Sequence, residues 1–189
     1  MKPFEFVLVI ISVIVGLALT EFAIGVSYMI QNFRTAHFYW PHITVMLFGL
    51  VSCLNYWGTV YKLRKIDAWS IMHIGLVFLS GLIFFIMTKL YFPDPDKFDL
   101  DYERYFKDNI KITFVLMICF VISFMLEAIV IRKVRQLRKF TIMIVFILAI
   151  SSGLLIDNHL YVGILTVILL LMQIAYMVRT KTLIADREN

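Results

Sequence analysis

The chain has few charged residues and no long polar stretch. Asp, Glu, Lys and Arg make up 16% of its 189 residues, whereas hydrophobic residues make up 61%. Soluble domains carry about 25% charged and about 45–50% apolar residues, so this composition indicates a polytopic membrane protein. The longest polar stretch, residues 93–111, is too short for a separate soluble domain. We therefore expect residues 1–189 to form a single transmembrane domain.

Cysteines and enzyme motifs are also scarce. Cys53 and Cys119 lie inside apolar runs without metal-ligand spacing, and we expect both to pack as small hydrophobic side chains. The sequence lacks Gly-x-Ser-x-Gly, a phosphate-binding glycine loop and His-Glu-x-x-His. An enzyme is therefore less expected than a non-enzymatic protein, although a membrane enzyme can place its groups on separate helices. No motif predicts a cofactor.

Six apolar runs predict an all-α fold of six transmembrane helices. They cover residues 4–31, 42–61, 68–92, 111–132, 140–156 and 160–178. A helix that crosses a bilayer needs about 20 apolar residues, with a range of about 17–25. The six helices could also form two inverted halves of three. That alternative rests on Leu19–Ile24 and Met125–Ile129, which each carry one acid in a similar apolar setting.

The basic residues predict the orientation of the helices. Twelve of the 18 Lys and Arg residues fall in the N-terminus, the connections after the second and fourth runs, and the C-terminal tail. The positive-inside rule then places both termini in the cytoplasm. The net charge of +5 therefore reflects orientation, and no nucleic-acid partner is expected. Phe38, Tyr39 and Trp40 lie at the predicted outer membrane interface, where amphipathic rings are stable.

An acidic residue, Glu21, lies deep within the first apolar run. A carboxylate at this depth is costly and usually marks a functional site. Four small residues recur at helical spacing beside it and predict close packing by a second helix: Gly16, Thr20, Ala23 and Ser27. Glu21 should therefore face the protein interior, in the outer half of the membrane. It either binds a cation or proton, or it is a structural acid that ties the first helix to a neighbour.

The leading hypothesis is a small channel or transporter for a cation or proton. Glu21 would be the intramembrane binding group, with Thr20, Tyr28 and Asn55 as candidate polar neighbours. A chain with so few helices has little material to enclose a pathway alone. We therefore expect a homo-oligomer in the lipid bilayer.

Four other polar residues inside the apolar runs have structural explanations. Glu127 is a second intramembrane acid, and pairing with Arg132 near the cytoplasmic end of its helix would account for it. Lys89 lies near the outer end of its run, where it can extend to the interface without a buried partner. His73 and Gln173 are expected to be structural hydrogen-bonding residues.

The alternative hypothesis is a non-catalytic membrane sensor, effector or assembly subunit that acts through its basic cytoplasmic loop. That loop contains Arg132, Lys133, Arg135, Arg138 and Lys139. It would bind anionic lipid head groups or a membrane or cytoplasmic protein partner, although orientation alone also explains its charge.

A third hypothesis is a metal-dependent enzyme on the outer side. His37, His42 and His159 all fall on the side that the orientation predicts to be outside. No pair of them has the spacing of a metal site on one helix face, so a zinc site is not specifically indicated.

Four short motifs resemble a known group of sequences. They are Gly16-Leu17-Ala18-Leu19-Thr20, Trp40-Pro41, Asn55-Tyr56-Trp57 and Tyr102-Glu103-Arg104. Together they resemble an uncharacterised family of small multi-pass bacterial inner-membrane proteins. The resemblance implies a bacterial inner-membrane location. It implies no activity and no functional residues, and it does not mark Glu21.

Overall fold

The structure is a computed structural model, and it describes residues 3–66, 68–94, 100–131, 133, 140–156 and 158–185. The described residues form six α-helices, with a short 3-10 turn, η1 (Leu63–Lys65), after the second. The α-helices are α1 (Pro3–Gln31), α2 (Trp40–Lys62), α3 (Ile71–Lys89), α4 (Tyr102–Val130), α5 (Thr141–Leu155) and α6 (His159–Ala185). The predicted all-α class is confirmed.

Among the described residues, five helices are long and apolar enough to cross a membrane: α1, α2, α3, α4 and α6. The exception, α5, has 15 residues, which cover about 22 Å at 1.5 Å per residue. That length is shorter than the hydrocarbon core of a typical bilayer, which is about 30 Å thick. The chain therefore has a helical polytopic fold of the membrane type, and its sixth span stays a prediction.

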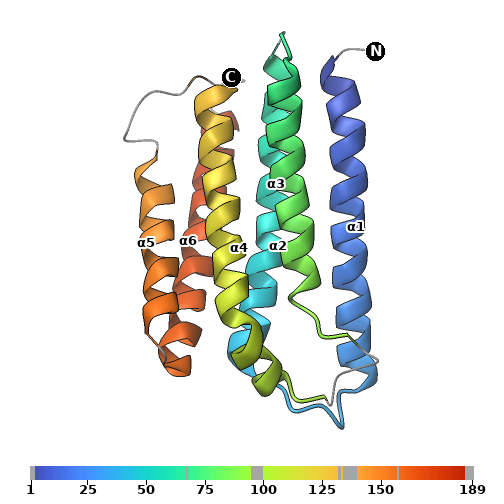
Figure 1. The fold of residues 1–189 in the computed structure, drawn as a ribbon, viewed down its shortest axis with the longest axis vertical. Coiled ribbons are helices and arrows are strands. Elements are labelled where there is room, and N and C mark those ends of the chain that lie inside the picture. The colour runs from blue at the N-terminus through green and yellow to red at the C-terminus, as the bar shows by residue number, and fades with distance from the viewer. Residues whose placement is uncertain are drawn as a thin grey trace.

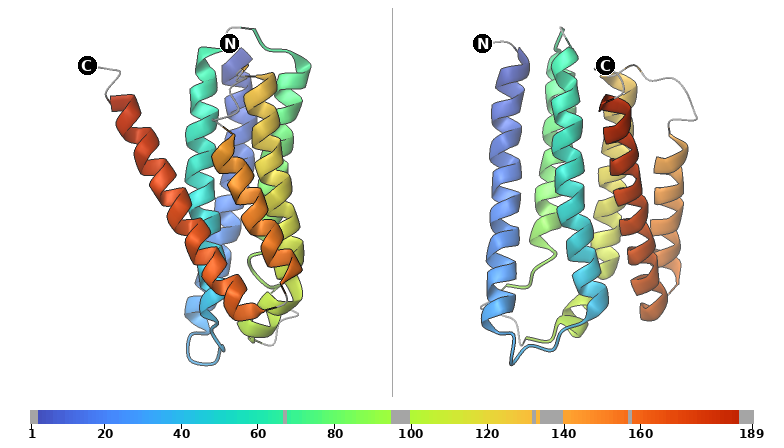
Figure 2. Two further views of the ribbon diagram at one scale, coloured as in Figure 1. Left: turned by 90° about the vertical axis from the view of Figure 1, so that its left-hand side faces the viewer. Right: turned by 180° about the vertical axis from the view of Figure 1, so that it is seen from behind.

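The helices alternate in direction, so the bundle has two ends (Figure 1). Helices α1, α3 and α5 end, and α2, α4 and α6 begin, at what we call the α1–α2 end. The opposite end is the α2–α3 end. The helices form two layers: α5, α4, α3 and α1 make a row, and α6 and α2 lie behind it (Figures 1 and 2).

The two halves of the chain pack differently. In the first half α1 packs along α3, whereas α6 packs mainly against α2 of the other half. An inverted repeat would pair equivalent helices in equivalent ways. This packing therefore gives the prediction of two inverted halves no support.

The packed face of α1 is not the predicted small-residue stripe. Its buried side chains are large and recur at steps of three and four: Val7, Ile11, Val15, Ala18 and Phe22. The predicted stripe of Gly16, Thr20, Ala23 and Ser27 is exposed instead, so none of the described helices of this chain packs closely there. Both stripes have helical spacing, but the larger side chains fill the space against α3 and gain more contact area.

Side chains cap the starts of α3 and α4. Ser70 and His73 form a capping box at the start of α3, which confirms His73 as a structural hydrogen-bonding residue. The Asp101 carboxylate accepts the backbone N–H of Arg104 at 3.0 Å and caps α4. The two cysteines differ: Cys53 is buried as predicted, but Cys119 is exposed on its helix, so its predicted packing is wrong.

Candidate functional site

A recess opens at the α1–α2 end of the bundle, where α3 stops short of its neighbours. α3 has 19 residues and is about 28 Å long, whereas α1 and α4 have 29 residues and are about 43 Å long. The difference leaves a cavity of about 380 Å³ beyond the last turn of α3. It is lined by Glu21, Ile24, Gly25, Tyr28, Lys89, Phe92, Pro93, Asp94, Tyr102 and Tyr105.

An ion pair between α1 and α3 forms one wall of this recess. Lys89 Nζ lies 2.8 Å from Glu21 Oε2, with the Glu21 side chain 24% exposed and the Lys89 side chain 65% exposed. Glu21 therefore faces the protein, as predicted, and it pairs with Lys89, a partner that the sequence did not indicate. The two residues lie 68 positions apart, so only the packing of α1 against α3 brings them together.

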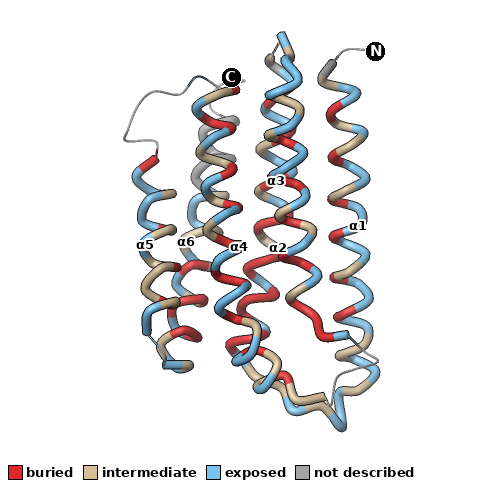
Figure 3. The backbone as a smooth tube through the Cα atoms, in the orientation of Figure 1, coloured by how far each residue is buried: buried red, intermediate tan, exposed pale blue. Residues whose placement is uncertain are grey.

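Two glycines leave space for the aromatic side chains that follow α3, and we call each such space a notch. The Phe92 ring lies against Gly25 of α1 so closely that a Cβ there would overlap it, and the Tyr91 ring does the same at Gly49 of α2. Phe22 packs against both rings, with centroid distances of 5.9 Å to Tyr91 and 5.5 Å to Phe92. The residues of this segment, Tyr91, Phe92 and Pro93, are all buried (Figure 3). Burial also raises the pKa of the Tyr91 hydroxyl, which stays neutral.

A tyrosine hydroxyl from α4 also forms hydrogen bonds to the segment that follows α3. Tyr105 Oη lies 3.2 Å from the Leu90 carbonyl oxygen and 3.1 Å from that of Phe92, and donates to these acceptors. The Leu90 and Phe92 carbonyl groups lie beyond the last residue of α3 and outside its hydrogen-bond ladder, and such groups are normally satisfied by caps or side chains. Tyr105 supplies this hydrogen bonding and fixes the segment that follows Lys89.

The recess brings together two of the four predicted ion-binding residues. Glu21 and Tyr28 both line it. Thr20 lies on the exposed side of α1, where its hydroxyl donates to the Gly16 carbonyl at 2.9 Å. It is therefore not part of the recess. Asn55 lines a different cavity, between α2, α4, α5 and α6. The spacing of residues along one helix could not show which of the four predicted residues line the recess, because the position of the recess depends on where α3 ends.

The second intramembrane acid, Glu127, is fully buried at 0% exposure. Its carboxylate accepts a hydrogen bond from Ser80 Oγ of α3. Tyr56 of α2 lies beside Ser80, with 3.5 Å between the hydroxyl oxygens, and donates to the Val77 carbonyl at 2.9 Å. A polar cluster thus joins α2, α3 and α4. The partner predicted for Glu127, Arg132, lies outside the described residues.

Helix α3 contacts both acids at different depths. Lys89 follows Ser80 by nine residues, which is about 14 Å along the helix axis. Phe84 and Met87 lie between them on α3, and both are fully buried. An apolar layer therefore separates the Glu21 recess from the Glu127 cluster.

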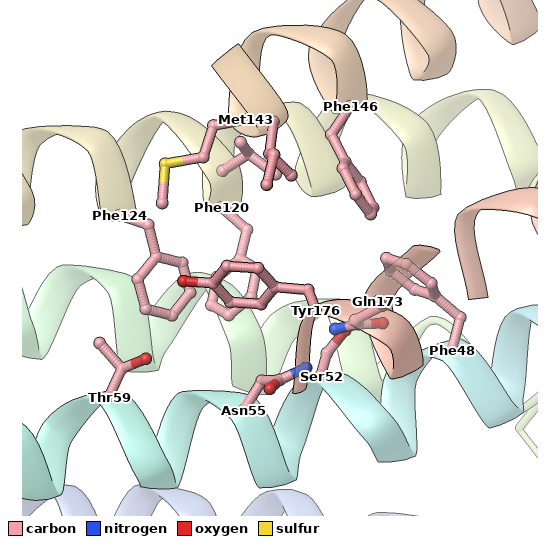
Figure 4. A pocket seen from close by; sticks show the side chains of 12 residues that line it. Phe48, Ser52, Asn55, Thr59, Phe120, Phe124, Met143, Phe146, Gln173 and Tyr176 are labelled. Atoms are coloured by element: carbon pink, nitrogen blue, oxygen red, sulfur yellow. The ribbon is translucent and has the colours of Figure 1, made fainter. Parts of the chain in front are cut away.

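The cavity that Asn55 lines has a volume of about 140 Å³ and is built from four helices (Figure 4). Gln173 of α6 donates from Nε2 to Ser52 Oγ of α2 at 2.8 Å, which confirms its structural hydrogen bond. The other lining residues are Phe48, Thr59, Phe120, Val121, Phe124, Ile142, Met143, Phe146 and Tyr176. The sequence did not indicate this cavity, because its walls come from segments that are far apart in the chain.

The three histidines proposed as metal ligands have separate surroundings. His37 is exposed and lies 3.8 Å from the Asp101 carboxylate, whereas His42 is 4% exposed and packs among the rings of Tyr102, Tyr105 and Phe106. His159 is the first residue of α6. Within the described ranges, no three His, Cys, Asp or Glu side chains are placed to hold a metal ion.

The basic loop is largely beyond the reach of the structure. Of its five basic residues only Lys133 is described, and its φ of 52° is in the left-handed region. Arg132, Arg135, Arg138 and Lys139 lie outside the described residues. The hypothesis that this loop binds anionic lipid or a protein partner stays a prediction.

Comparison of the chain with protein-family models, with curated proteins and with solved structures gives no match. The resemblance to a bacterial membrane-protein family therefore stays a prediction. The function must be argued from the site itself.

Proposed function

We propose that the protein is a small integral-membrane channel or transporter for a cation or proton, in which Glu21 is the binding group and Lys89 its exchange partner. The observation that supports this proposal is the Glu21–Lys89 ion pair, which lies in a recess between helices long enough to span a membrane. Ionisable groups at such depth are costly and are retained mainly on ion or proton pathways.

The chemistry of the pair suits exchange. A cation or proton that reaches the Glu21 carboxylate neutralises it and releases the Lys89 ammonium toward the open side of the recess. Among the described residues that line it, the recess offers two carboxylates, from Glu21 and Asp94, and one ammonium, from Lys89. Carboxylate oxygens are preferred ligands of hard cations, so a cation suits this lining better than an anion.

The energy of the pair also favours exchange over a purely structural role. Ion pairs that remain partly exposed contribute only about 0–1 kcal/mol to stability. An incoming cation at modest concentration can therefore compete with Lys89 for the carboxylate. A fully buried pair would resist such competition, because removal of one partner would leave a buried charge at a cost of about 3–5 kcal/mol.

Glu127 provides a second protonatable group on the same route. It lies beyond the apolar layer of Phe84 and Met87, on the far side from Glu21. In this conformation the layer closes the path between the two acids. Transport would need that layer to hydrate or its helices to shift.

We further propose the setting of this activity. All six helices would cross a bacterial inner membrane, with both termini in the cytoplasm, and the chain would act as a homo-oligomer. The positive-inside distribution of Lys and Arg supports this orientation. The recess then opens on the outer side.

The proposal is tested by flux in liposomes. Purified protein is reconstituted, a proton or monovalent-cation gradient is applied, and the internal concentration is followed with a fluorescent indicator. Glu21→Gln should reduce the flux at least about tenfold, because the amide neither carries the charge nor exchanges the proton. Glu5→Gln is the matched control, since Glu5 lies near the start of the same helix and outside the recess, and it should retain the flux. Equal flux in wild type and Glu21→Gln would remove Glu21 from the mechanism, and the absence of flux in all three proteins would overturn transport.

A further inference from the structure

A second cavity lies in the other half of the bundle, away from the recess. It is formed by α2, α4, α5 and α6 (Figure 4). Helices α5 and α6 lie close at the α1–α2 end and diverge toward the α2–α3 end (Figure 2). The cavity lies in this angle, with Met143 and Phe146 of α5 on one side and Gln173 and Tyr176 of α6 on the other. A molecule dissolved in the bilayer can therefore reach it from the side.

The cavity has a polar wall and an aromatic wall, and none of its lining residues is charged. Ser52, Asn55 and Thr59 follow one another along one face of α2 and point into the cavity (Figure 4). Phe120 and Phe124 of α4 supply aromatic rings on the opposite side. A charged head group would find no counter-ion here. The lining therefore selects a neutral molecule with both a flat apolar body and polar atoms.

The polar wall has unused hydrogen-bonding capacity. Gln173 uses Nε2 for the bond to Ser52, but its Oε1 atom is buried and has no hydrogen-bond partner within the described part of the chain. The Asn55 amide likewise makes no side-chain hydrogen bond to any residue in the described ranges. Buried polar atoms are rarely left unsatisfied in native proteins, because each costs about 1–3 kcal/mol. The buried Gln173 Oε1 atom is closed off from the cavity, so the polar group that the cavity offers to a bound molecule is the accessible Asn55 amide.

The volume of the cavity indicates the size of the group that it holds. It measures about 140 Å³. An engineered apolar cavity of about 150 Å³ in another protein holds one benzene molecule. One six-membered ring therefore fits, and any longer part of the molecule must leave through the angle between α5 and α6.

We propose that this cavity binds the ring of a one-ring isoprenoid quinone or its quinol, with the tail directed into the bilayer. A quinone carbonyl oxygen accepts from the Asn55 amide N–H, and a quinol hydroxyl donates to the Asn55 amide oxygen. The phenylalanine rings pack against the flat head group. A phospholipid is disfavoured, because its charged head group lacks a partner among the lining residues. A bare acyl chain would leave the Asn55 amide without a hydrogen-bond partner.

The test is equilibrium binding of a radiolabelled benzoquinone with a two-unit isoprenoid tail to the purified full chain in nanodiscs. Wild type should bind it saturably, with one molecule per chain, above the level of empty nanodiscs. Asn55→Leu should raise the dissociation constant about tenfold, as expected for one lost hydrogen bond, and Gln173→Leu should also raise it, because it releases Ser52 and changes the polar wall. Gln31→Leu is the matched control, because Gln31 also donates to a serine hydroxyl but on the exposed side of α1. Its binding should equal that of wild type.

A second variant and a competition experiment guard against an ambiguous result. Gln173→Leu loses a bond between α2 and α6, so if it fails to fold, Asn55→Leu decides. A fatty alcohol of matched hydrophobicity, which has a hydroxyl but no ring, should compete at least about tenfold more weakly than unlabelled quinone. The proposal is overturned by absent saturable binding, by equal competition from the alcohol or a phospholipid, or by unchanged binding in Asn55→Leu.

Discussion

At the scale of single residues, the glycines of this chain are not equivalent. Gly25 and Gly49 each leave a notch that an aromatic ring fills, whereas Gly16 has no atom within 4 Å of the place that a Cβ would occupy. Hydropathy along the sequence does not distinguish these positions. The difference depends on where the segment after α3 crosses α1 and α2.

The two kinds of glycine predict opposite effects of the same substitution. Gly25→Ala places a Cβ inside the Phe92 ring, and such overpacking should destabilise the fold by about 1–3 kcal/mol. Gly16→Ala is the control and should be neutral or should stabilise by up to about 1 kcal/mol, because alanine is the better helix former. Chemical unfolding in mixed micelles measures both changes. Equal destabilisation by the two variants would contradict the notch.

The sequence predicted the orientation or hydrogen bonding of some polar residues and missed it for others. It placed Glu21 toward the protein and gave His73 and Gln173 structural hydrogen bonds, and both statements follow from the cost of polar groups in apolar surroundings. It missed the partner of Lys89 and misplaced Thr20. Partners on distant segments and the choice between two helical stripes depend on tertiary packing, which periodicity does not encode.

At the scale of elements, α3 is the helix on which both acidic sites depend. It supplies Lys89 to Glu21 of α1 and Ser80 to Glu127 of α4. Its short length also creates the recess, and Tyr105 of α4 holds the segment where it ends. The apolar runs predicted the bounds of α1, α2 and α5 to within two residues, but α4 begins at Tyr102 rather than at residue 111, and α3, expected at residues 68–92, covers Ile71–Lys89. The recess opens because α3 is shorter than α1 and α4.

The hydroxyl that holds the end of α3 gives a prediction for this element. Tyr105→Phe removes the donor to the Leu90 and Phe92 carbonyls and should destabilise the protein by about 0.5–1.5 kcal/mol. Tyr61→Phe is the control, because Tyr61 is exposed near the α2–α3 end, and it should change stability by less than about 0.5 kcal/mol. Thermal unfolding of the two variants in one detergent compares them. A Tyr105→Phe protein as stable as the control would show that α3 is held by packing alone.

At the scale of the whole molecule, the fold class follows from composition and apolar run length, but the number of crossings does not. Five helices satisfy the length requirement, and α5 is shorter than a typical hydrocarbon core. If α5 crosses, the bilayer thins or its flanking residues extend to the interface. The positions of the Lys and Arg residues favour six crossings, because they place the basic loop before α5 and the basic C-terminal tail on the same side, which requires both α5 and α6 to cross.

Cysteine labelling tests the number of crossings. In a background without Cys53 and Cys119, Thr35→Cys and Asn158→Cys should react with an impermeant maleimide added to whole cells. Arg64→Cys should react only after the cells are permeabilised, since it follows α2 at the opposite end of the bundle. Labelling of Asn158→Cys only after permeabilisation would mean that α5 does not cross.

The central claim is that Glu21 binds the transported cation or proton and that Lys89 competes for it. The most direct measurement is the half-saturating cation concentration for flux in liposomes that carry wild type, Glu21→Gln or Lys89→Met. The account predicts opposite effects: Glu21→Gln abolishes saturable flux, whereas Lys89→Met lowers the half-saturating concentration severalfold, because the competing ammonium is gone. If the Glu21–Lys89 pair is only structural, the loss of either residue should have the same effect. The claim would therefore be contradicted if Glu21→Gln and Lys89→Met lose flux, or keep it, to the same extent.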